Sequence, residues 1–356
     1  MSLDRITLST FRNHAETRLD GTARFNLLVG PNGAGKTNVL EALSLLAPGR
    51  GLRRAALPEM AGNGGNGAFA VSAALAQADG EAVVLGTGTT PDAPRRRRVQ
   101  VNGAEATAVS LGEWLAVAWL TPAMDRLFAD SAGSRRRYMD RLAVAIDPQH
   151  ARHAARYENA LRERNRLLSD ERVPDAAWLD SIEAQMADAG AALAGGRARL
   201  MSSLAASLAD LPDQPFARPD LTYVPGGPED LAAHLAANRR RDRAAQRTLD
   251  GPHRDELEVI MHGKGVPAAQ CSTGEQKAML IAITLAHADL AAKGRPGVLL
   301  LDEVAAHLDP VRREALFERL AQGASQVWMT GTELAPFASL EGAARWQVEG
   351  GEARRL

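Results

Sequence analysis

The sequence has one cysteine and no long apolar run, and each shortage excludes a class of protein. The single cysteine, Cys271, excludes an internal disulfide and suits the reducing cytoplasm, where we expect the protein to work. No apolar stretch approaches the roughly 18 residues of a membrane span, and the N-terminus lacks an apolar targeting core, so no membrane partner is expected. The 42 basic and 43 acidic side chains nearly cancel. Any nucleic-acid surface must therefore come from local clustering of charge.

A phosphate-binding loop is the strongest motif in the chain. The apolar stretch 25–29 runs into Gly30-Pro31-Asn32-Gly33-Ala34-Gly35-Lys36-Thr37-Asn38, and a helical pattern follows. The glycines let backbone N–H groups surround a phosphate, and the new helix N-terminus adds its positive dipole end. Lys36 can reach the β and γ phosphates, and the Thr37 hydroxyl can ligate Mg²⁺. The sequence therefore predicts a site for a nucleoside triphosphate.

A buried strand that ends in two acids predicts the rest of the catalytic centre. Residues 298–301 are apolar and are followed by Asp302 and Glu303, and the carboxyl end of such a strand is where an α/β sheet places its ligands. We expect Asp302 to hold Mg²⁺, mostly through water, and Glu303 to polarise the attacking water as general base. Most of the chain separates these acids from Lys36, which indicates a split head domain rather than a compact P-loop kinase.

A second helix start precedes the acidic strand, with the sequence Ser272-Thr273-Gly274-Glu275-Gln276. The Ser-x-Gly-x-Gln pattern is similar to the signature of ABC ATPases, and its free N–H groups suit the γ-phosphate of a nucleotide on a second molecule. The simpler alternative is an ordinary helix cap formed by Ser272 or Thr273. The stretch His307-Leu308-Asp309-Pro310 follows the acids where ABC proteins carry their D-loop. The order of loop, signature and acids favours an ABC-type head.

The predicted fold is α/β, an ABC-type P-loop ATPase head with an added antiparallel β-sheet and an inserted α-helical second domain. Residues 1–120 form the first part of the head, with the phosphate loop and a meander of short strands that includes a hairpin at Asn102-Gly103. Residues 121–244 form the helical lobe, in which long helices are expected at about 147–168 and 175–210. Residues 245–356 form the second part of the head and end in a hairpin.

Three further stretches make the chain resemble the RecF family of bacterial recombinational-repair ATPases. They are Phe11-Arg12-Asn13, Leu249-Asp-Gly-Pro-His-Arg-Asp255, and Trp119-Leu-Thr-Pro followed by Arg135-Arg-Arg-Tyr-Met-Asp-Arg141. The resemblance runs from Leu3 to about Glu333. It implies ATP-dependent dimerisation, DNA binding, and action with mediator proteins that load the strand-exchange recombinase at gaps.

The resemblance also implies roles for the residues at matching positions. It implies ATP contacts from Arg12, Asn13, Gly30, Pro31, Asn32, Gly33, Ala34, Gly35, Lys36, Thr37, Asn38, Ser272, Gly274, Glu275 and Gln276, Mg²⁺ ligation by Thr37 and Asp302, and catalysis by Lys36 and Glu303. The chain departs from transporter ATPases at two places. The signature lacks their Gly-Gly pair, and Thr330-Gly331-Thr332 stands where a transporter has its switch histidine. We therefore expect slow hydrolysis, with ATP acting more as a clamp ligand than as a fuel.

Arginine clusters are the candidates for contact with DNA. They are Arg95 to Arg98, Arg135 to Arg137 with Arg141, Arg152/Arg156/Arg162/Arg164/Arg166, and Arg239 to Arg241 with Arg243. For any one cluster, a solvated face or an internal ion-pair network is the simpler explanation. Few aromatic residues lie among them, so the backbone of duplex or junction DNA fits better than stacked single-stranded bases. Arg254 could serve the nucleotide or the DNA.

These motifs suggest a clamp mechanism. ATP and Mg²⁺ bind to the phosphate loop, the signature helix of a second subunit closes over the γ-phosphate, and the closed homodimer holds DNA until Glu303-assisted hydrolysis releases it. Three alternatives stay open at this point: the soluble ATPase subunit of an ABC transporter, another SMC/Rad50-like head, and a DNA-binding scaffold that never hydrolyses ATP.

Overall fold

The computed structural model describes residues 2–62, 66–76, 82–172, 174–209, 211–212, 214–305 and 308–356. Contacts divide the chain into two compact units. The first comprises Met1–Asp125, Pro212–Phe216 and Lys277–Leu356, and the second Arg126–Leu211 and Ala217–Gln276. The sequence placed a boundary at residue 245, whereas residues 245–276 group with the helical unit. The reason is that strand β10 (Glu256–Met261) pairs with β9 (Pro219–Val224) of that unit.

The first unit contains an antiparallel sheet whose six strands follow the order β2-β1-β4-β5-β6-β7. Its strands are β1 (Ser2–Phe11), β2 (His14–Asp20), β4 (Ala70–Ala76), β5 (Ala82–Thr90), β6 (Ala93–Val101) and β7 (Ala104–Glu105). The hairpin predicted at Asn102-Gly103 is confirmed, because both residues have positive φ (50° and 79°) and Val101 pairs with Ala104 across the turn. The added antiparallel sheet is therefore present.

The second sheet of this unit is mainly parallel, in the order β15-β14-β3-β13-β12-β8. Its strands are β3 (Phe25–Val29), β8 (Ala116–Leu120), β12 (Gly297–Leu301), β13 (Gln326–Gly331), β14 (Ala344–Glu349) and β15 (Glu352–Arg355). Only β15 runs antiparallel to its neighbour, which confirms the predicted C-terminal hairpin. Because β3, β13 and β12 run parallel to one another, the segments that follow these strands leave the same edge of the sheet.

Helix α1 (Lys36–Ser44) lies between the two sheets, in contact with β1 of one and with β8 and β13 of the other. Its apolar positions Val39, Leu40 and Leu43 are buried, and their spacing is the helical pattern that follows the loop in the sequence. The unit also holds α2 (Leu57–Met60), α3 (Ala108–Trp114), α10 (Pro310–Gln322), most of α9 (Thr273–Ala291), and the short 3-10 turns η1 (Pro122–Met124) and η5 (Ala335–Phe337). The phosphate-loop helix therefore sits in the core of this unit.

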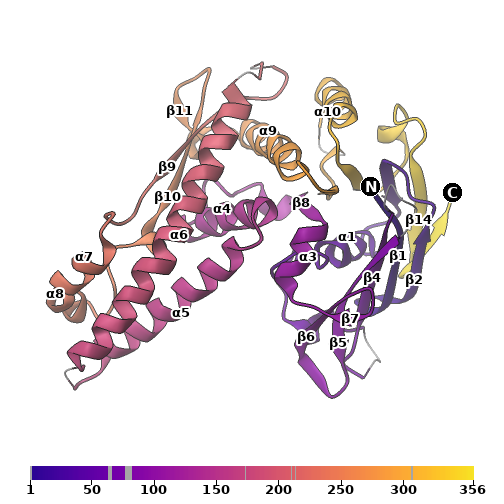
Figure 1. Cartoon of the computed structure of the whole chain (residues 1–356). Helices are drawn as coiled ribbons and strands as arrows, with labels where there is room; N and C mark the ends of the chain where they lie inside the picture. Colours follow the sequence, from indigo (N-terminus) through magenta and orange to yellow (C-terminus); the bar gives the residue numbers. More distant parts are fainter. Residues whose placement is uncertain are drawn as a thin grey trace. The chain divides into compact units, whose positions relative to one another are not determined.

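The second unit is built on two long helices, α5 (His150–Ser169) and α6 (Ala176–Ala209), which pack along each other (Figure 1). Apolar residues spaced three, four or seven positions apart along α6 are buried, which agrees with the helix expected at about 175–210: Leu179, Ile182, Met186, Ala189, Leu193, Leu200, Leu204 and Leu208. Leu211, which continues this spacing, is half-buried and lies beyond the end of the helix. The remaining elements are α4 (Ala132–Ile146), α7 (Leu231–Ala237), α8 (Arg239–Ala244), η2 (Pro252–Arg254), η3 (Ala268–Gln270) and a three-stranded sheet of β9, β10 and β11 (Val266–Pro267). The sequence predicted only helices between 121 and 244, so β9 is an addition to that prediction. Within the described parts of the chain, none of the helices is both long and apolar enough to cross a membrane.

Candidate nucleotide-binding site

The phosphate loop connects β3 to α1 through backbone geometry that only glycine accepts readily. Gly35, the residue before α1, has φ 116°, and a Cβ added there would lie 2.7 Å from Nε2 of His14 and 2.8 Å from Oδ1 of Asn13. The N–H of Gly30 donates to the carbonyl oxygen of Gly331 at 3.3 Å, which ties the start of the loop to the end of β13. A larger side chain at Gly35 would therefore displace the loop from the residues that support it.

Polar side chains of the β1–β2 turn support the loop. Asn13 donates its Nδ2–H to the carbonyl oxygen of Ala34 (3.0 Å) and accepts from Nδ2 of Asn38 (2.7 Å), so both predicted asparagines touch the loop or its helix. Nε2 of the buried His14 lies 3.0 Å from the carbonyl oxygen of Gly35, which can only accept, so Nε2 carries the proton. Burial lowers the pKa of His14. The sequence analysis did not single out His14 as part of this site.

The ammonium group of Lys36 lies inside the loop. Its Nζ donates to the carbonyl oxygens of Gly30 (2.7 Å) and Pro31 (2.8 Å), and the residue is only 4% exposed. Burial lowers the pKa of Lys36, and the carboxylates of Glu303 and Asp302 oppose that shift. The predicted phosphate ligand and the two predicted acids therefore belong to one electrostatic site.

A chain of hydrogen bonds joins the loop to the acidic strand. The Thr37 hydroxyl donates to Oδ1 of Asp302 (2.9 Å), and the Thr330 hydroxyl donates to the same oxygen (2.8 Å). The N–H of Glu303 in turn donates to Oγ1 of Thr330 (2.9 Å). Glu303 has φ 54°, a left-handed conformation that is uncommon for glutamate and that clusters at functional sites. The structure thus brings the predicted metal ligands and the predicted base to one place.

Thr330 is the connecting residue that the sequence analysis passed over. The stretch Thr330-Gly331-Thr332 was noted only for lacking a histidine, whereas the buried hydroxyl of Thr330 holds Asp302 and the backbone of Glu303 in register. A hydroxyl at the end of the strand beside the acidic strand was the available signal. Its partners show that it positions the acids.

Replacing Thr330 with valine tests this positioning role. The substitution keeps the shape but removes both hydrogen bonds, so we expect ATP turnover to fall by about 10- to 100-fold, the usual cost of losing a group that orients a metal ligand. Thr330→Ser keeps the hydroxyl and should restore most of the rate. Thr332→Val is the matched control, because Thr332 is exposed. Equal steady-state turnover of wild type and Thr330→Val would contradict this role.

Arg12 is held by an internal carboxylate beside the loop helix. Its Nε and Nη2 donate to the two oxygens of the fully buried Glu41 (2.9 and 2.7 Å), and its Nη1 donates to the carbonyl oxygen of Glu59 (2.7 Å). Arg53 joins the same carboxylate at 2.8 Å and donates to Oδ1 of Asn38 at 2.6 Å. The side chain of Arg53 is 41% exposed. Arg53 therefore brings a second guanidinium to this corner of the site, which the sequence analysis did not predict.

The signature segment begins α9, and its first residues belong to the second unit. The Ser272 hydroxyl and N–H donate to Oε2 of Glu275 at 3.0 and 2.9 Å, and Oγ of Ser272 accepts from the N–H of Glu275 at 3.4 Å. An ion pair with Lys264, together with the Ser272 hydrogen bonds, lowers the pKa of Glu275 to about 2. Gln276 is buried and donates its Nε2–H to the carbonyl oxygen of Cys271 at 2.9 Å. Ser272 thus forms a helix cap, as in the simpler alternative.

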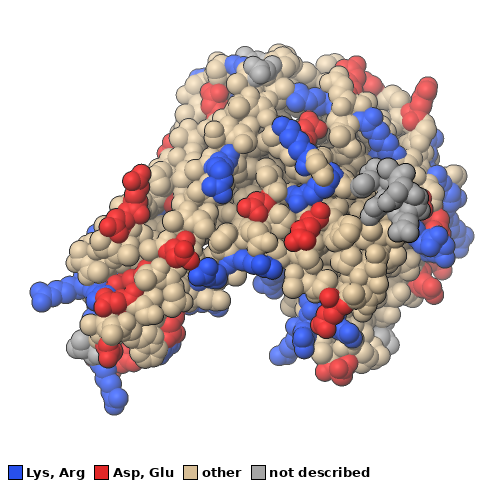
Figure 2. Space-filling model, viewed as in Figure 1, with Lys and Arg blue, Asp and Glu red and all other residues tan. Residues whose placement is uncertain are grey.

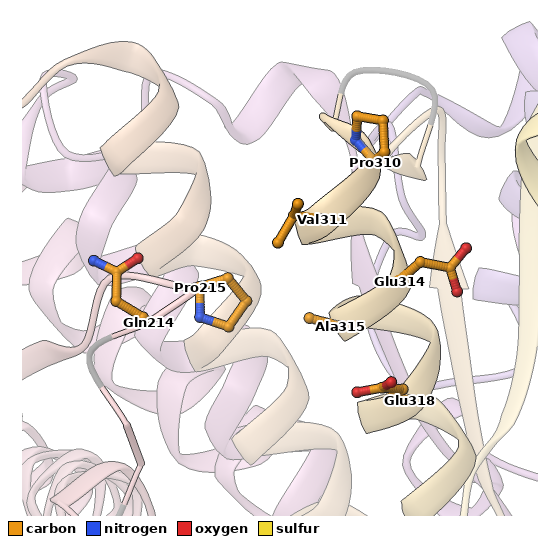
Figure 3. Close-up of a pocket in the computed structure, with 7 residues that line it drawn as sticks. All are labelled: Gln214, Pro215, Pro310, Val311, Glu314, Ala315 and Glu318. Carbon is orange, nitrogen blue, oxygen red and sulfur yellow. The ribbon is translucent and has the colours of Figure 1, made fainter.

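Beyond the acids, the predicted D-loop is seen only in part. His307 lies outside the described residues, and Oδ1 of Asp309 accepts from the N–H of Arg312 at 3.0 Å as the cap of α10. An open hollow lies beside α10 and is lined by Gln214, Pro215, Pro310, Val311, Glu314, Ala315 and Glu318 (Figure 3). Its lining contains two glutamates and no basic side chain, so it is unsuited to a nucleotide.

The residues around Asp302 fit a magnesium ion bound together with phosphate. Thr37 and Asp302 offer hard oxygen ligands that lie 2.9 Å apart, and Mg²⁺ is typically held by one or two protein oxygens plus substrate phosphates and water. Among the residues that the structure describes, no group of three or more His, Cys, Asp or Glu side chains could hold a metal by itself. The site therefore suits an ion that arrives with the nucleotide.

The fold and the site define an ABC-type P-loop ATPase head. A mainly parallel sheet carries the phosphate loop after β3 and the acid pair after β12, an antiparallel sheet accompanies it, and a helical unit interrupts it. Comparisons with known proteins agree with this assignment of an ATPase head. The family model described as "RecF/RecN/SMC N terminal domain" matches residues 2–337.

Individual relatives narrow the assignment. The DNA replication and repair protein RecF of Mesorhizobium japonicum is 48% identical over 361 residues, covering 97% of this chain and 95% of that protein. A solved structure of the recombination mediator protein RecF-ATP in the RecFOR pathway has a TM-score of 0.88 at 23% identity and covers 100% of this chain and 97% of its own. The Smc head domain of Pyrococcus furiosus has a TM-score of 0.56 at 16% identity, with 100% and 96% covered. The chain therefore belongs to the RecF family of DNA replication and repair ATPases.

Proposed function

We propose that the site between β3 and β12 binds ATP with Mg²⁺ and hydrolyses it slowly. Lys36 contacts the β and γ phosphates, Thr37 and Asp302 hold the ion, and Glu303 accepts a proton from the attacking water. Mg²⁺, when bound, neutralises charge that develops on the phosphates. The observation that carries this proposal is the chain of hydrogen bonds from Thr37 through Asp302 and Thr330 to the backbone of Glu303. It supports a metal ligand and a base that are already positioned relative to the loop.

We propose that ATP binding causes two copies of the chain to form a closed homodimer. The N-terminal turn of α9, Ser272 to Gln276, closes over the γ-phosphate of a nucleotide held by a second copy of the chain. Moving a pair of subunits from 1% to 99% closed takes about 5.5 kcal/mol of differential binding. Charge-assisted contacts to phosphate at two sites are strong enough to supply it. Hydrolysis removes those contacts and opens the pair.

We propose that the closed pair holds the backbone of duplex or junction DNA, in the cytoplasm, and acts with recombination mediator proteins to load the strand-exchange recombinase. The resemblance of the whole chain to DNA replication and repair proteins supports this proposal. Basic and acidic side chains are interspersed on the face shown in Figure 2, so a DNA contact on this face would come from particular arginines rather than from one broad basic surface.

Many arginines of the predicted clusters are engaged within the protein. Arg97 is half-buried and donates to the carbonyl oxygens of Leu45, Ala47 and Gly49 beyond the end of α1, and desolvation of its guanidinium lowers its pKa to about 10. The cluster members that pair with carboxylates are Arg96, Arg135, Arg156, Arg164, Arg166, Arg239 and Arg241. These contacts favour the ion-pair explanation for those side chains and narrow the candidates for DNA contact.

The experiment that tests the proposed function is DNA binding by the purified protein with ATP·Mg²⁺ and with ADP across a salt series. We expect tight binding that requires ATP, with a log–log slope of about −0.9 for each phosphate contacted. Duplex, gapped and single-stranded DNA of equal length provide the comparison of substrates. Absence of binding with either nucleotide at low salt would contradict the DNA clamp and favour an ATPase that acts on proteins.

A further inference from the structure

The stretch Gly251 to Asp255 forms a tight turn in the second unit that exposes one guanidinium. Pro252 and Asp255 are buried, His253 is half-buried, and Arg254 is exposed. The turn is closed by hydrogen bonds from the N–H of Arg254 to the carbonyl oxygen of Gly251 (2.8 Å) and from the N–H of Asp255 to that of Pro252 (3.2 Å). Within the part of the chain that the structure describes, Nε is the one nitrogen of the Arg254 guanidinium with a hydrogen-bond partner, the carbonyl oxygen of Leu249 at 3.2 Å.

A buried polar network fixes this turn from beneath. Oδ2 of Asp255 accepts from Nη1 of Arg197 (2.7 Å) and from the Tyr223 hydroxyl (2.5 Å), and its Oδ1 accepts from the N–H of Gly226 (2.8 Å). His253 lies 2.8 Å from the Tyr157 hydroxyl. Such a network rigidifies the backbone that it holds. Because the Arg254 side chain itself takes no part in the network, the turn is built to present it.

Two further guanidinium groups lie at the start of α4, and one of them reaches the turn. Nη1 of Arg136 donates to the carbonyl oxygen of Asp255 at 2.9 Å, which places this side chain next to Arg254. A Cβ added to Gly133 would lie 3.2 Å from Nη1 of Arg137 and 3.7 Å from Nη2 of Arg136. Nη2 of Arg137 donates to the Ser134 hydroxyl at 2.7 Å. The two α4 guanidinium groups therefore converge on Gly133, and Arg136 continues to the turn.

The acidic side chains nearest this cluster do not pair with it. Glu256 is bound by both Nε and Nη2 of Arg135, at 2.7 and 2.8 Å, and Oδ1 of Asp130 accepts from the N–H of Ser131 at 2.6 Å. Among the described residues, no carboxylate lies within 4.0 Å of the guanidinium groups of Arg136, Arg137 or Arg254. Burial and the nearby Arg197 and Arg254 charges lower the pKa of Arg136. The carboxylates of Asp255 and Glu256 oppose this shift, but they are already bound to Arg197 and Arg135. Guanidinium groups gathered beside carboxylates that other donors occupy suit an anion.

We propose that Arg136, Arg137 and Arg254 form a phosphate-binding cluster that contacts the sugar–phosphate backbone of bound DNA. The inference rests on the proposed DNA binding and deepens it by naming the contact residues. Guanidinium groups suit phosphate because their planar forks donate two hydrogen bonds at once. The hydroxyls of Tyr157 and Tyr223 are turned into the network, to His253 and Asp255, so these rings do not offer a stacking surface for a base.

The test compares DNA affinity of the wild type with Arg254→Ala, Arg137→Ala and Arg136→Ala in ATP·Mg²⁺ across a salt series. We expect each variant to bind roughly tenfold more weakly and the magnitude of the log–log slope to fall by about 0.9 for each phosphate that the variant no longer binds. Arg254→Lys should keep the slope and lose part of the affinity. The matched control is Arg166→Ala, whose exposed side chain already pairs with Glu163. This control should bind as the wild type does.

The outcomes separate this inference from the proposed function. If the wild type bound DNA and all three alanine variants bound it with the same affinity and the same salt slope, the phosphate-binding cluster would be overturned. The proposed DNA clamp would not be affected by that result. No ATP-dependent binding by the wild type would overturn both. Unchanged DNA binding with a weaker affinity for ATP in Arg254→Ala would assign the cluster to nucleotide phosphate instead. Thermal unfolding of Arg254→Lys and Arg137→Ala checks that a loss of affinity is not a loss of folding, because neither side chain belongs to the buried network.

Discussion

Glu303→Gln is expected to lower ATP turnover by about 10²- to 10⁴-fold while ATP still binds, because the amide cannot accept the proton that the carboxylate accepts. The substitution keeps the size of the side chain. The backbone of Glu303 is held by its N–H to the Thr330 hydroxyl, and Asp302 keeps its bonds to Thr37 and Thr330. The loop and the ion ligands should therefore be unaffected. Single-turnover measurement of phosphate release reports the chemical step directly.

The same variant should accumulate the ATP-bound dimer, because closure no longer ends in hydrolysis. Light scattering after gel filtration in ATP·Mg²⁺ would show a dimer that persists in Glu303→Gln and decays in the wild type. Glu333→Gln is the matched control, since Glu333 is exposed just beyond the end of β13. An unchanged turnover rate in Glu303→Gln would remove this residue from the mechanism and favour a scaffold that does not hydrolyse ATP.

Arg164→Ala is expected to destabilise the helical unit by about 3–5 kcal/mol, the usual cost of removing one partner of a buried ion pair. Arg164 is fully buried on α5 and donates to Glu183 (3.0 Å), Asp242 (2.7 Å) and the Thr248 hydroxyl (2.8 Å). Arg239 also pairs with Glu183, so Asp242 is the carboxylate left buried with its strongest partner removed. A loss of this size is a large fraction of the roughly 5–15 kcal/mol that stabilise a typical domain.

Urea unfolding followed by circular dichroism measures this effect through the shift of the transition midpoint. Arg166→Ala on the same helix is the matched control, because its solvent-exposed pair with Glu163 should contribute little to stability. If both variants shifted the midpoint equally, the buried network around Arg164 would not be a source of stability. The comparison also tests whether the arginines of α5 serve the fold rather than DNA.

Local patterns carried most of the fold prediction. The alternation of glycine with small residues from Gly30 to Gly35, followed by apolar positions three and four apart, identifies a loop and a helix without knowledge of any distant residue. The stripe of α6 and the Asn102-Gly103 turn are of the same kind. Strand β8 escaped prediction because a five-residue apolar run has no periodicity that separates a buried strand from a helix. Strand β9 was not predicted either, because the strand that pairs with it, β10, follows about 30 residues later and no local hairpin signal joins the two.

The residues of the candidate site that would contact ATP, Mg²⁺ or the attacking water were predictable from the sequence. The residue that positions them was not. Lys36, Thr37, Asp302 and Glu303 carry side chains whose chemistry is visible in the sequence. In the sequence, Thr330 was noted only because it stands where a transporter ATPase has a histidine. Its positioning role depends on β13 lying between β3 and β12, which the sequence does not show.

By itself the sequence determined the class of the protein, the loop that suits a nucleotide and the acids that suit its metal, because each depends on neighbouring residues along the chain. Only the tertiary structure decided which arginines are engaged and which remain available. A guanidinium has the same charge everywhere in the sequence, but Arg97 caps a helix end, Arg164 neutralises two buried acids, and Arg254 is exposed on a turn. Burial and the position of the nearest carboxylate set these differences, and both are properties of contacts between segments far apart in the chain.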